Sequence, residues 1–339
     1  MVRSPAFRLL FLNKQYIPVQ PWRPFKMNPS RICFALAALL SASPASASTP
    51  FAHGVSDRRL CEILPPNQLQ TLDRLSRIAN LSEAEFKTRV DQAIQLHAPW
   101  AAAHGGHLRA EADWNDPTVN AYALQVDDDW TVQVFGGLAR RPELTADGFS
   151  LILCHEIGHH LGGFPLNSKP VWEWGAVEGQ ADYFSTQACA RTLWGAALSE
   201  NATYRSTAPA IVQVKCDQAW SKAADQDLCY RVSEASRSLG NLYASVASKA
   251  APDLATPDPF KVYATFEDHP DPQCRLDTLF HGALCSTAFD LHWIPGRNHP
   301  SGQGSVEAEQ DAAKVSCDGL ASRDPGARPR CWYRSQLYP

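Results

Sequence analysis

The run HEIGHH at residues 155–160 has the residue types and the spacing of a catalytic metal site. On a helix, His155 and His159 lie four positions apart on one face, so their two imidazoles can bind the same ion. Glu156 lies beside that face, where it can take a proton from a water molecule that the metal activates. His160 is rotated by about 100° from His159 and cannot join the same site. The run therefore predicts a helix that binds zinc, with Glu156 as the general base.

The run EGQAD at residues 178–182 supplies a candidate for the third ligand. Catalytic zinc takes three protein ligands and keeps one position open for water. Glu178 and Asp182 share a helical face. We expect Glu178 to bind the metal and Asp182 to accept the remaining N–H of a ligand histidine such as His155, which would fix the tautomer of that ring. A solvated acidic helix face is the other interpretation of this run.

Together these two runs resemble the HExxH and ExxxD helices of the gluzincin metallopeptidases. Three further motifs resemble the HtpX and CAAX-prenyl-protease type, metallopeptidase family forty-eight. Residues 120–123 (NAYA) are similar to its N-A-F-A strand, residues 135–138 (FGGL) stand where it has a strand followed by a helix, and residues 269–275 (HPDPQCR) match its H-P-x4-R motif. The resemblance implies an α+β, zincin-like metallopeptidase domain that is mostly helical, with a small antiparallel or mixed sheet.

The resemblance also implies a function, that of a zinc-dependent endopeptidase, a hydrolase of peptide bonds that binds one Zn²⁺ per chain. Its protein or peptide substrate would lie extended against an edge strand near Asn120 and Tyr122. His269 is the implied stabiliser of the charge that develops on the carbonyl oxygen, and Arg275 would orient it or act as a second electrophile. The other interpretation of His269 is that it only shapes a turn before a helix.

The chain departs from known members of this family, which often carry membrane helices or helical repeats. It has instead about 85 residues between Asp182 and His269, and a tail that contains cysteines. Two other functions stay open. One is a periplasmic chaperone or binding module on this fold, with latent or absent proteolysis. The other is a zinc hydrolase that cuts a non-peptide amide such as a cell-wall cross-link.

Composition and the N-terminal region indicate export. Ten cysteines among 339 residues are many for a protein of a reducing compartment. Residues 32–40 are apolar, Arg31 precedes them and the small residues 45–47 (ASA) follow, which is the pattern of a secretory signal peptide. Met27 offers an alternative start. We expect cleavage after residue 47 and a mature chain that is soluble, without a transmembrane segment, and periplasmic or secreted.

The charge balance bears on the partners. With 31 Lys and Arg against 35 Asp and Glu, the net charge of −4 leaves no global basic field. This balance argues against nucleic acid as the main partner, and the protein or peptide substrate is implied by the resemblance alone.

Loss of Cys33 with the signal peptide would leave an odd number of cysteines, so at least one thiol should stay free. We expect Cys154, inside the apolar metal helix, to be that buried thiol. The remaining cysteines can pair in many ways. Short separations favour the pairs Cys216–Cys229, Cys274–Cys285 and Cys317–Cys331, and they leave Cys61 with Cys189.

Periodicity and capping signals indicate the elements that must position the candidate residues. Ser82 and Glu85 form a capping box within a helical pattern. Helices are expected over residues 60–100, 145–161, about 176–194 and about 229–247. Strands are expected over residues 119–126 and 130–135. The predicted organisation is a signal peptide (1–47), an N-terminal helical segment (48–107), a zinc metallopeptidase domain (108–295) and a C-terminal tail held by disulfides (296–339).

Overall fold

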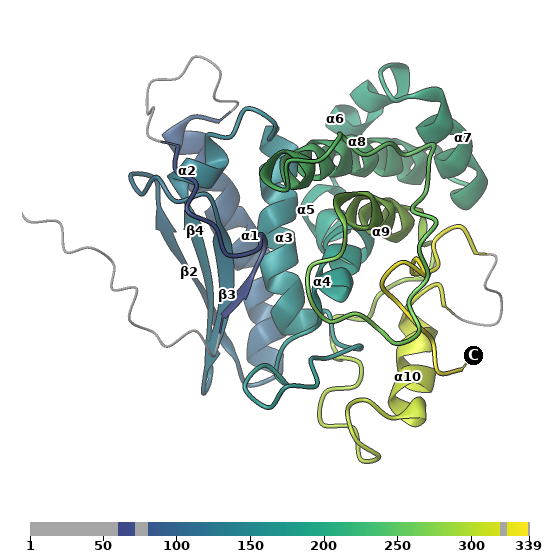
Figure 1. Cartoon of the computed structure of the whole chain (residues 1–339). Helices are drawn as coiled ribbons and strands as arrows, with labels where there is room; N and C mark the ends of the chain where they lie inside the picture. Colours follow the sequence, from purple (N-terminus) through teal and green to yellow (C-terminus); the bar gives the residue numbers. More distant parts are fainter. Residues whose placement is uncertain (1–59, 72–80, 319–323, 338–339) are drawn as a thin grey trace, which may run out of the picture. The chain divides into compact units, whose positions relative to one another are not determined.

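A small sheet and a larger set of helices make up the part of the chain that the structure describes, residues 60–71, 81–318 and 324–337. The structure is a computed structural model. Figure 1 shows the sheet beside the long helices, with most of the helical part on one side of it. The expected α+β class with a small mixed sheet is confirmed. The expected signal peptide, its cleavage site and Met27 lie outside the described residues.

The sheet is mixed and has the strand order β1-β3-β4-β2. β2 and β4 are parallel, whereas β3 is antiparallel to both β1 and β4. Ala121 pairs with Val134 and Ala123 with Val132, and all four side chains are fully buried on one face of the sheet. Helices pack on this face. The strands are β1 (Leu60–Glu62), β2 (His107–Asp113), β3 (Ala121–Val126) and β4 (Asp129–Phe135).

The α-helices of the described residues range from 4 residues in α2 to 24 residues in α8. They are α1 (Glu83–Ala103), α2 (Gly136–Ala139), α3 (Ala146–Leu161), α4 (Glu178–Phe184), α5 (Ala190–Trp194), α6 (Leu198–Thr203), α7 (Ala210–Ala219), α8 (Ala223–Val246), α9 (Pro272–Leu284) and α10 (Val306–Ala312). A π-helical segment η1 (Ser185–Cys189) and the short 3₁₀ segments η2 (Tyr204–Ser206) and η3 (Ala313–Val315) lie among them.

Helix α3 is the expected metal helix and lies between the sheet and helices α4 and α8 (Figure 1). The Thr145 side chain caps its first turn by accepting a hydrogen bond from the backbone N–H of Gly148. The helix ends at Gly162, and Gly163 follows with φ +67°, a conformation that favours glycine. All its residues from Asp147 to Leu161 are buried, which explains why its sequence is apolar on every side. The predicted span of this helix is confirmed.

The second expected helix, residues 176–194, is built from α4, η1 and α5. Two side-chain hydroxyls bind backbone carbonyls where the π-helical middle begins. The hydroxyl of Ser185 donates to the carbonyl of Asp182 at 2.7 Å, and that of Thr186 donates to the carbonyl of Tyr183 at 3.2 Å. Side-chain hydroxyls that bind nearby carbonyls compete with the regular backbone ladder and alter helix geometry.

The N-terminal part differs from the predicted helix over residues 60–100. The capping box of Ser82 and Glu85 is confirmed, and α1 begins directly after it. Residues 60–62 instead form strand β1, because their backbone pairs with β3, a long-range partner that local periodicity cannot reveal. The expected helix over 229–247 is α8, which begins earlier, at Ala223.

Four disulfides join described residues, two of them between the tail and α9, and the cysteine pairing corrects most of our expectations. Only Cys216–Cys229 is confirmed. The other bridges are Cys154–Cys189, Cys274–Cys331 and Cys285–Cys317, and Cys61 is the free cysteine among the described residues.

The reasons for these corrections are geometric. Cys274 and Cys285 stand at the two ends of α9, roughly 16 Å apart at 1.5 Å per residue, whereas a disulfide requires Cα atoms within about 7 Å. The tail therefore bridges to both ends of this helix. Cys154 is not a free thiol, because Cys189 on the next helix lies beside it with a Cα–Cα distance of 5.5 Å.

The C-terminal tail packs directly against α4. Trp332 is fully buried over Gly179, and a Cβ atom at that glycine would come within 2.2 Å of the indole ring, measured to the nearest ring carbon. Arg328 donates from Nε to the side-chain oxygen of Gln180 at 2.7 Å, and the Tyr183 hydroxyl donates to the carbonyl of Gly326 at 2.6 Å. The tail thus supports the helix that carries Glu178 and Asp182.

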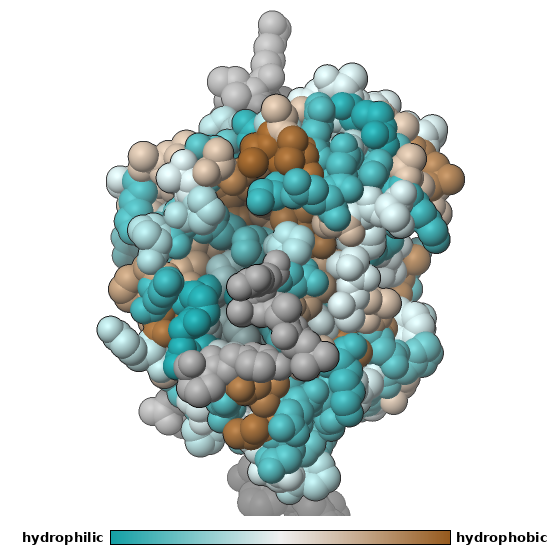
Figure 2. All heavy atoms as spheres, turned by 90° about the vertical axis from the view of Figure 1, so that its right-hand side faces the viewer, coloured by the Kyte–Doolittle hydropathy of each residue, from teal (hydrophilic) through white to brown (hydrophobic). Residues whose placement is uncertain are grey.

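Figure 2 shows the face that lies at the right of Figure 1, where hydrophobic side chains form separate patches among hydrophilic ones. None of the helices in the described ranges is both long enough and apolar enough to cross a lipid bilayer.

Replacement Trp332→Ala should lower the free energy of unfolding by about 3–5 kcal/mol, because it removes a fully buried indole and leaves a cavity over α4. The matched control is Tyr263→Ala, whose side chain is 99% exposed and should change stability by about 0.5 kcal/mol or less. Denaturant unfolding of both variants measures the difference. Equal effects would contradict the supporting role of the tail.

Candidate metal centre

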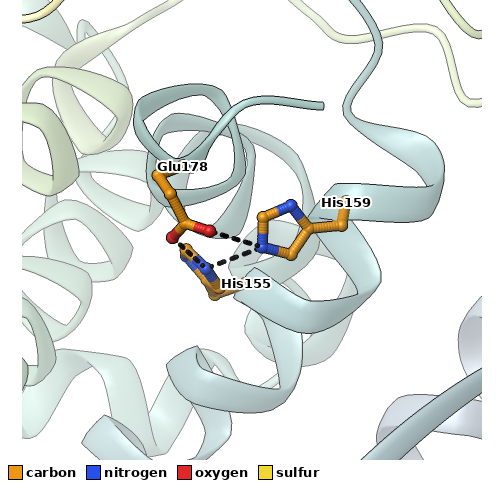
Figure 3. A group of neighbouring side chains, drawn as sticks. All are labelled: His155, His159 and Glu178. Carbon is orange, nitrogen blue, oxygen red and sulfur yellow. Dashed lines mark hydrogen bonds and ion pairs between the residues drawn. The ribbon is translucent and has the colours of Figure 1, made fainter. Parts of the chain in front are cut away.

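Three potential metal ligands meet at one point between α3 and α4, as Figure 3 shows for His155, His159 and Glu178. The Nε2 atoms of His155 and His159 are 3.1 Å apart. One Glu178 oxygen lies 3.3 Å from Nε2 of His155, and the other lies 3.5 Å from Nε2 of His159. Two ligand atoms about 2.0–2.1 Å from a tetrahedrally bound zinc ion lie roughly 3.3 Å apart. The three donors therefore have the spacing of a tetrahedral metal site.

The outer nitrogens of the two rings fix their tautomers. Nδ1 of His155 lies 2.8 Å from the Asp182 carboxylate, and Nδ1 of His159 lies 2.8 Å from the carbonyl oxygen of Ala176. Both partners only accept, so both Nδ1 atoms must carry the proton. In the neutral rings each Nε2 then presents a lone pair to the same point. Without a cation or a proton between them, two such lone pairs at 3.1 Å would repel each other.

The pKa values reflect this arrangement. Burial alone would lower the pKa of His155, but the Asp182 carboxylate outweighs it and raises the value to about 9. Burial lowers the pKa of His159 to about 4. Although burial acts in the opposite direction, His269 and His159 hold the pKa of Glu178 well below its usual range, so this side chain is a carboxylate.

Glu156 is fully buried beside these ligands, and neither of its carboxylate oxygens has a hydrogen-bond partner among the described residues. Burial, its largest influence, raises the pKa of Glu156 well above the ordinary value. A buried carboxyl group without a partner is rare in folded proteins and is typical of functional sites. The residues thus fit a bound cation with the carboxyl group of Glu156 beside it.

His160 lies outside this group, as expected from its position on the helix. Its ring stacks between Trp130 and Trp174, with centroid distances of 5.4 Å and 5.1 Å. Burial lowers its pKa to about 3, so the ring is neutral and belongs to the packing between α3 and the sheet.

The structure brings His269 and Arg275 to the centre. Nε2 of His269 lies 3.6 Å from a Glu178 oxygen. Its Nδ1 lies 2.9 Å from the Asp268 carboxylate, and Nε2 lies 2.7 Å from the backbone carbonyl oxygen of Glu62. Because both ring nitrogens face acceptors, both carry protons. Burial opposes this charge, but Glu178 and Asp268 outweigh it and raise the pKa of His269.

Arg275 is buried and links several parts of the site. It donates from Nε and Nη2 to the two oxygens of Asp182, at 2.7 Å and 2.9 Å. Its Nη1 donates to the carbonyl oxygen of Ile63 at 2.6 Å. Its guanidinium lies over the ring of Tyr243, 3.6 Å from the ring centroid. The side chain is therefore held in one position next to Glu178.

The strand with Tyr122 is not an edge strand in this structure, in contrast to our expectation. β1 occupies that edge and pairs Glu62 with Tyr122. Asn120 precedes β3 and binds the backbone of Leu64, with Oδ1 accepting from its N–H and Nδ2 donating to its carbonyl, both at 3.1 Å. The Tyr122 ring lies on the outer face of the sheet against Phe135, with a centroid distance of 6.0 Å.

Two contributors to the centre were not predicted from sequence. One is Tyr243 on helix α8, whose residues form no recognisable motif. The hydroxyl of Tyr243 donates to an oxygen of Asp182 at a distance of 3.2 Å. Residues 60–64 lie against the centre, although their pattern reads as helical. In both cases the only signal is a contact between segments far apart in sequence.

A pocket of about 1210 Å³ opens beside the centre. It reaches His269 and Arg275, and Leu64, Tyr243, Phe260 and Phe266 contribute apolar walls. This volume is sufficient for several side chains of a peptide.

Comparison with protein-family models, with curated proteins and with solved structures found no match for this chain. The evidence for its function is therefore the geometry of the site.

Zinc affinity should rise about tenfold per pH unit between pH 7 and pH 9, because the proton on His155, with a pKa of about 9, must leave before the metal binds. Below that pKa the proton competes with zinc, and above it the competition ends. Titration against a chelator of known pH dependence measures the slope, and calorimetry in two buffers should detect the release of at least one proton per ion at pH 7. A pH-independent affinity in this range would contradict the site.

The double replacement Cys154→Ala/Cys189→Ala should weaken zinc binding and lower the free energy of unfolding by about 2–4 kcal/mol, since this bridge joins α3 to the segment after α4. The matched control is Cys216→Ala/Cys229→Ala, a bridge between α7 and α8 that should cost similar stability but leave zinc affinity unchanged. Unfolding and chelator titration of both variants provide the test. If the two double variants bind zinc with equal affinity, the Cys154–Cys189 bridge does not align the ligands.

Proposed function

We propose that this protein is an exported zinc-dependent endopeptidase of the gluzincin type. The observation that carries the proposal is the buried carboxyl group of Glu156, which has no hydrogen-bond partner in the described ranges, next to three converging ligands. A purely structural metal site needs ligands but has no use for such a base.

The donor set supports zinc. Two imidazoles and one carboxylate at tetrahedral spacing are ligands that Zn²⁺ accepts readily. When bound, zinc would act as a Lewis acid on a carbonyl oxygen and on water. The helix pair α3 and α4 beside a small mixed sheet supports the zincin-like assignment. Four disulfides support a periplasmic or secreted location.

The residues of this chain would divide the reaction as follows. Glu156 takes a proton from the attacking water, whose oxygen bonds to the carbonyl carbon of the peptide. The C–N bond then breaks, and Glu156 passes the proton to the leaving nitrogen. Cationic His269 donates to the carbonyl oxygen as negative charge grows there, and Arg275 holds a neighbouring carbonyl.

One observation favours a second candidate, a binding module with latent proteolysis. His155, Glu156 and His159 have no exposed surface, and residues 60–62 occupy the edge of β3, where the Glu62 carbonyl accepts from His269. A substrate can pair with β3 only if these residues move.

Glu156→Gln should keep zinc affinity within a few-fold and lower cleavage by roughly 10²–10⁴-fold, because an amide of the same shape cannot accept the proton. The test compares new termini in an envelope proteome and in the chain itself. The Glu156→Gln substitution is compared in two backgrounds, the parent chain and the variant Ile63→Ala/Leu64→Ala. The second background lacks two buried side chains that anchor residues 60–64. Equal cleavage with and without Glu156 would refute the mechanism.

A further inference from the structure

Residues 60–64 lie where an extended peptide would bind to the candidate centre. β1 runs antiparallel to β3, with Cys61 opposite Ala123 and Glu62 opposite Tyr122. The pairing continues through the N–H of Ile63, which donates to the carbonyl oxygen of Ala121 at 3.2 Å. Adding a strand to a sheet edge is a common way for proteins to bind extended peptides.

The backbone of this segment is bound by the residues assigned to the reaction. His269 donates to the carbonyl oxygen of Glu62 at 2.7 Å, and Arg275 donates to that of Ile63 at 2.6 Å. Asn120 binds both the N–H and the carbonyl of Leu64. An ordinary edge strand is bound by its neighbouring strand alone, whereas three consecutive residues here are bound by side chains of the site.

The contacts of this segment with His269 favour one of its peptide bonds as the one nearest the centre. One atom, Nε2 of His269, lies 2.7 Å from the Glu62 carbonyl oxygen and 3.6 Å from ligand Glu178, so a single side chain connects that carbonyl to the ligands. The bond that follows it joins Glu62 to Ile63. Beyond this bond, Ile63 and Leu64 are 0% and 1% exposed and pack into the main hydrophobic core, and Leu64 also lines the pocket beside the centre.

We propose that Leu60–Leu64 occupies the substrate cleft in the direction and register of a substrate, with the Glu62–Ile63 bond at the centre, and so closes the full chain to other peptides. The proposal rests on the proposed endopeptidase function. It also names the substrate class, an extended peptide with two apolar residues directly after the cut bond. A tethered segment has an effective concentration of about millimolar or higher, so a dilute peptide cannot displace it.

Cys61 provides a reporter within the segment, because it is buried and is the free cysteine of the described chain. Modification of Cys61 by N-ethylmaleimide, located by peptide mass, measures how often the segment leaves the cleft. In protein loaded with Co²⁺, the rate of metal removal by 1,10-phenanthroline measures access to the centre. Neither readout depends on proteolysis.

Ile63→Ala/Leu64→Ala should increase both rates at least about tenfold, because it removes two buried side chains that hold the segment. The matched control is Val212→Ala, a truncation of a fully buried residue on α7 that should leave both rates unchanged. Unchanged rates in the folded double variant would overturn the proposal.

A second measurement uses the parent chain and does not depend on the stability of a variant. Hydroxamoyl-Ile-Leu-amide carries a zinc-binding group followed by the two apolar residues, so binding of this compound must displace the segment and increase modification of Cys61. Hydroxamoyl-Asp-Asp-amide, with the same zinc-binding group, should not do so. A cut between Glu62 and Ile63 in the zinc-loaded parent, absent in Glu156→Gln, would also support the register.

The two proposals fail in different ways. An opened variant that releases metal rapidly but cleaves no peptide would leave the occupied cleft standing and refute the endopeptidase. A parent chain that cleaves other proteins while Cys61 stays protected would support the endopeptidase and refute the occupied cleft.

Discussion

The carboxylate of Asp182 holds together the elements on which the rest of the site depends. It is fully buried on α4 and accepts from His155 on α3, Tyr243 on α8 and Arg275 on α9. The cost of burying its charge is offset by the guanidinium and by hydrogen bonds to both oxygens. Arg275 in turn is satisfied by Asp182, by the ring of Tyr243 and by the carbonyl of Ile63. Loss of this carboxylate would leave the buried Arg275 with Glu178, 3.9 Å away, as its remaining ion-pair partner, and would remove the acceptor that orients His155.

The parts of the site that sequence could predict are those fixed by local helix geometry. His155 with His159, and Glu178 with Asp182, lie on common faces because residues four apart always do so on a helix. Thr145 and the glycines at 162 and 163 mark the ends of α3 by local capping rules. A contact between α3 and α4 was expected, because a catalytic ion bound by the two histidines of α3 needs a third ligand and Glu178 on α4 can supply it.

The remaining parts depend on contacts across the chain, and local patterns do not contain them. Residues 60–62 have a helical period, but pairing with β3 and the side chains of Asn120 and His269 overrides it. Cysteine pairing failed for a related reason. A short separation favours a bridge only when the intervening chain can bend, and α9 is a straight rod between Cys274 and Cys285.

The contact of Trp332 with Gly179 joins the helix that carries Glu178 to a segment that is translated much later. Both histidine ligands, Glu178 and Asp182 leave the ribosome long before residues 326–332, which contact Gly179, Gln180 and Tyr183 of α4. Until then, α4 exposes apolar surface, and both ends of α9 carry unpaired thiols. The contacts that cover this side of α4, and the two disulfides at the ends of α9, therefore form only after the tail has been translated.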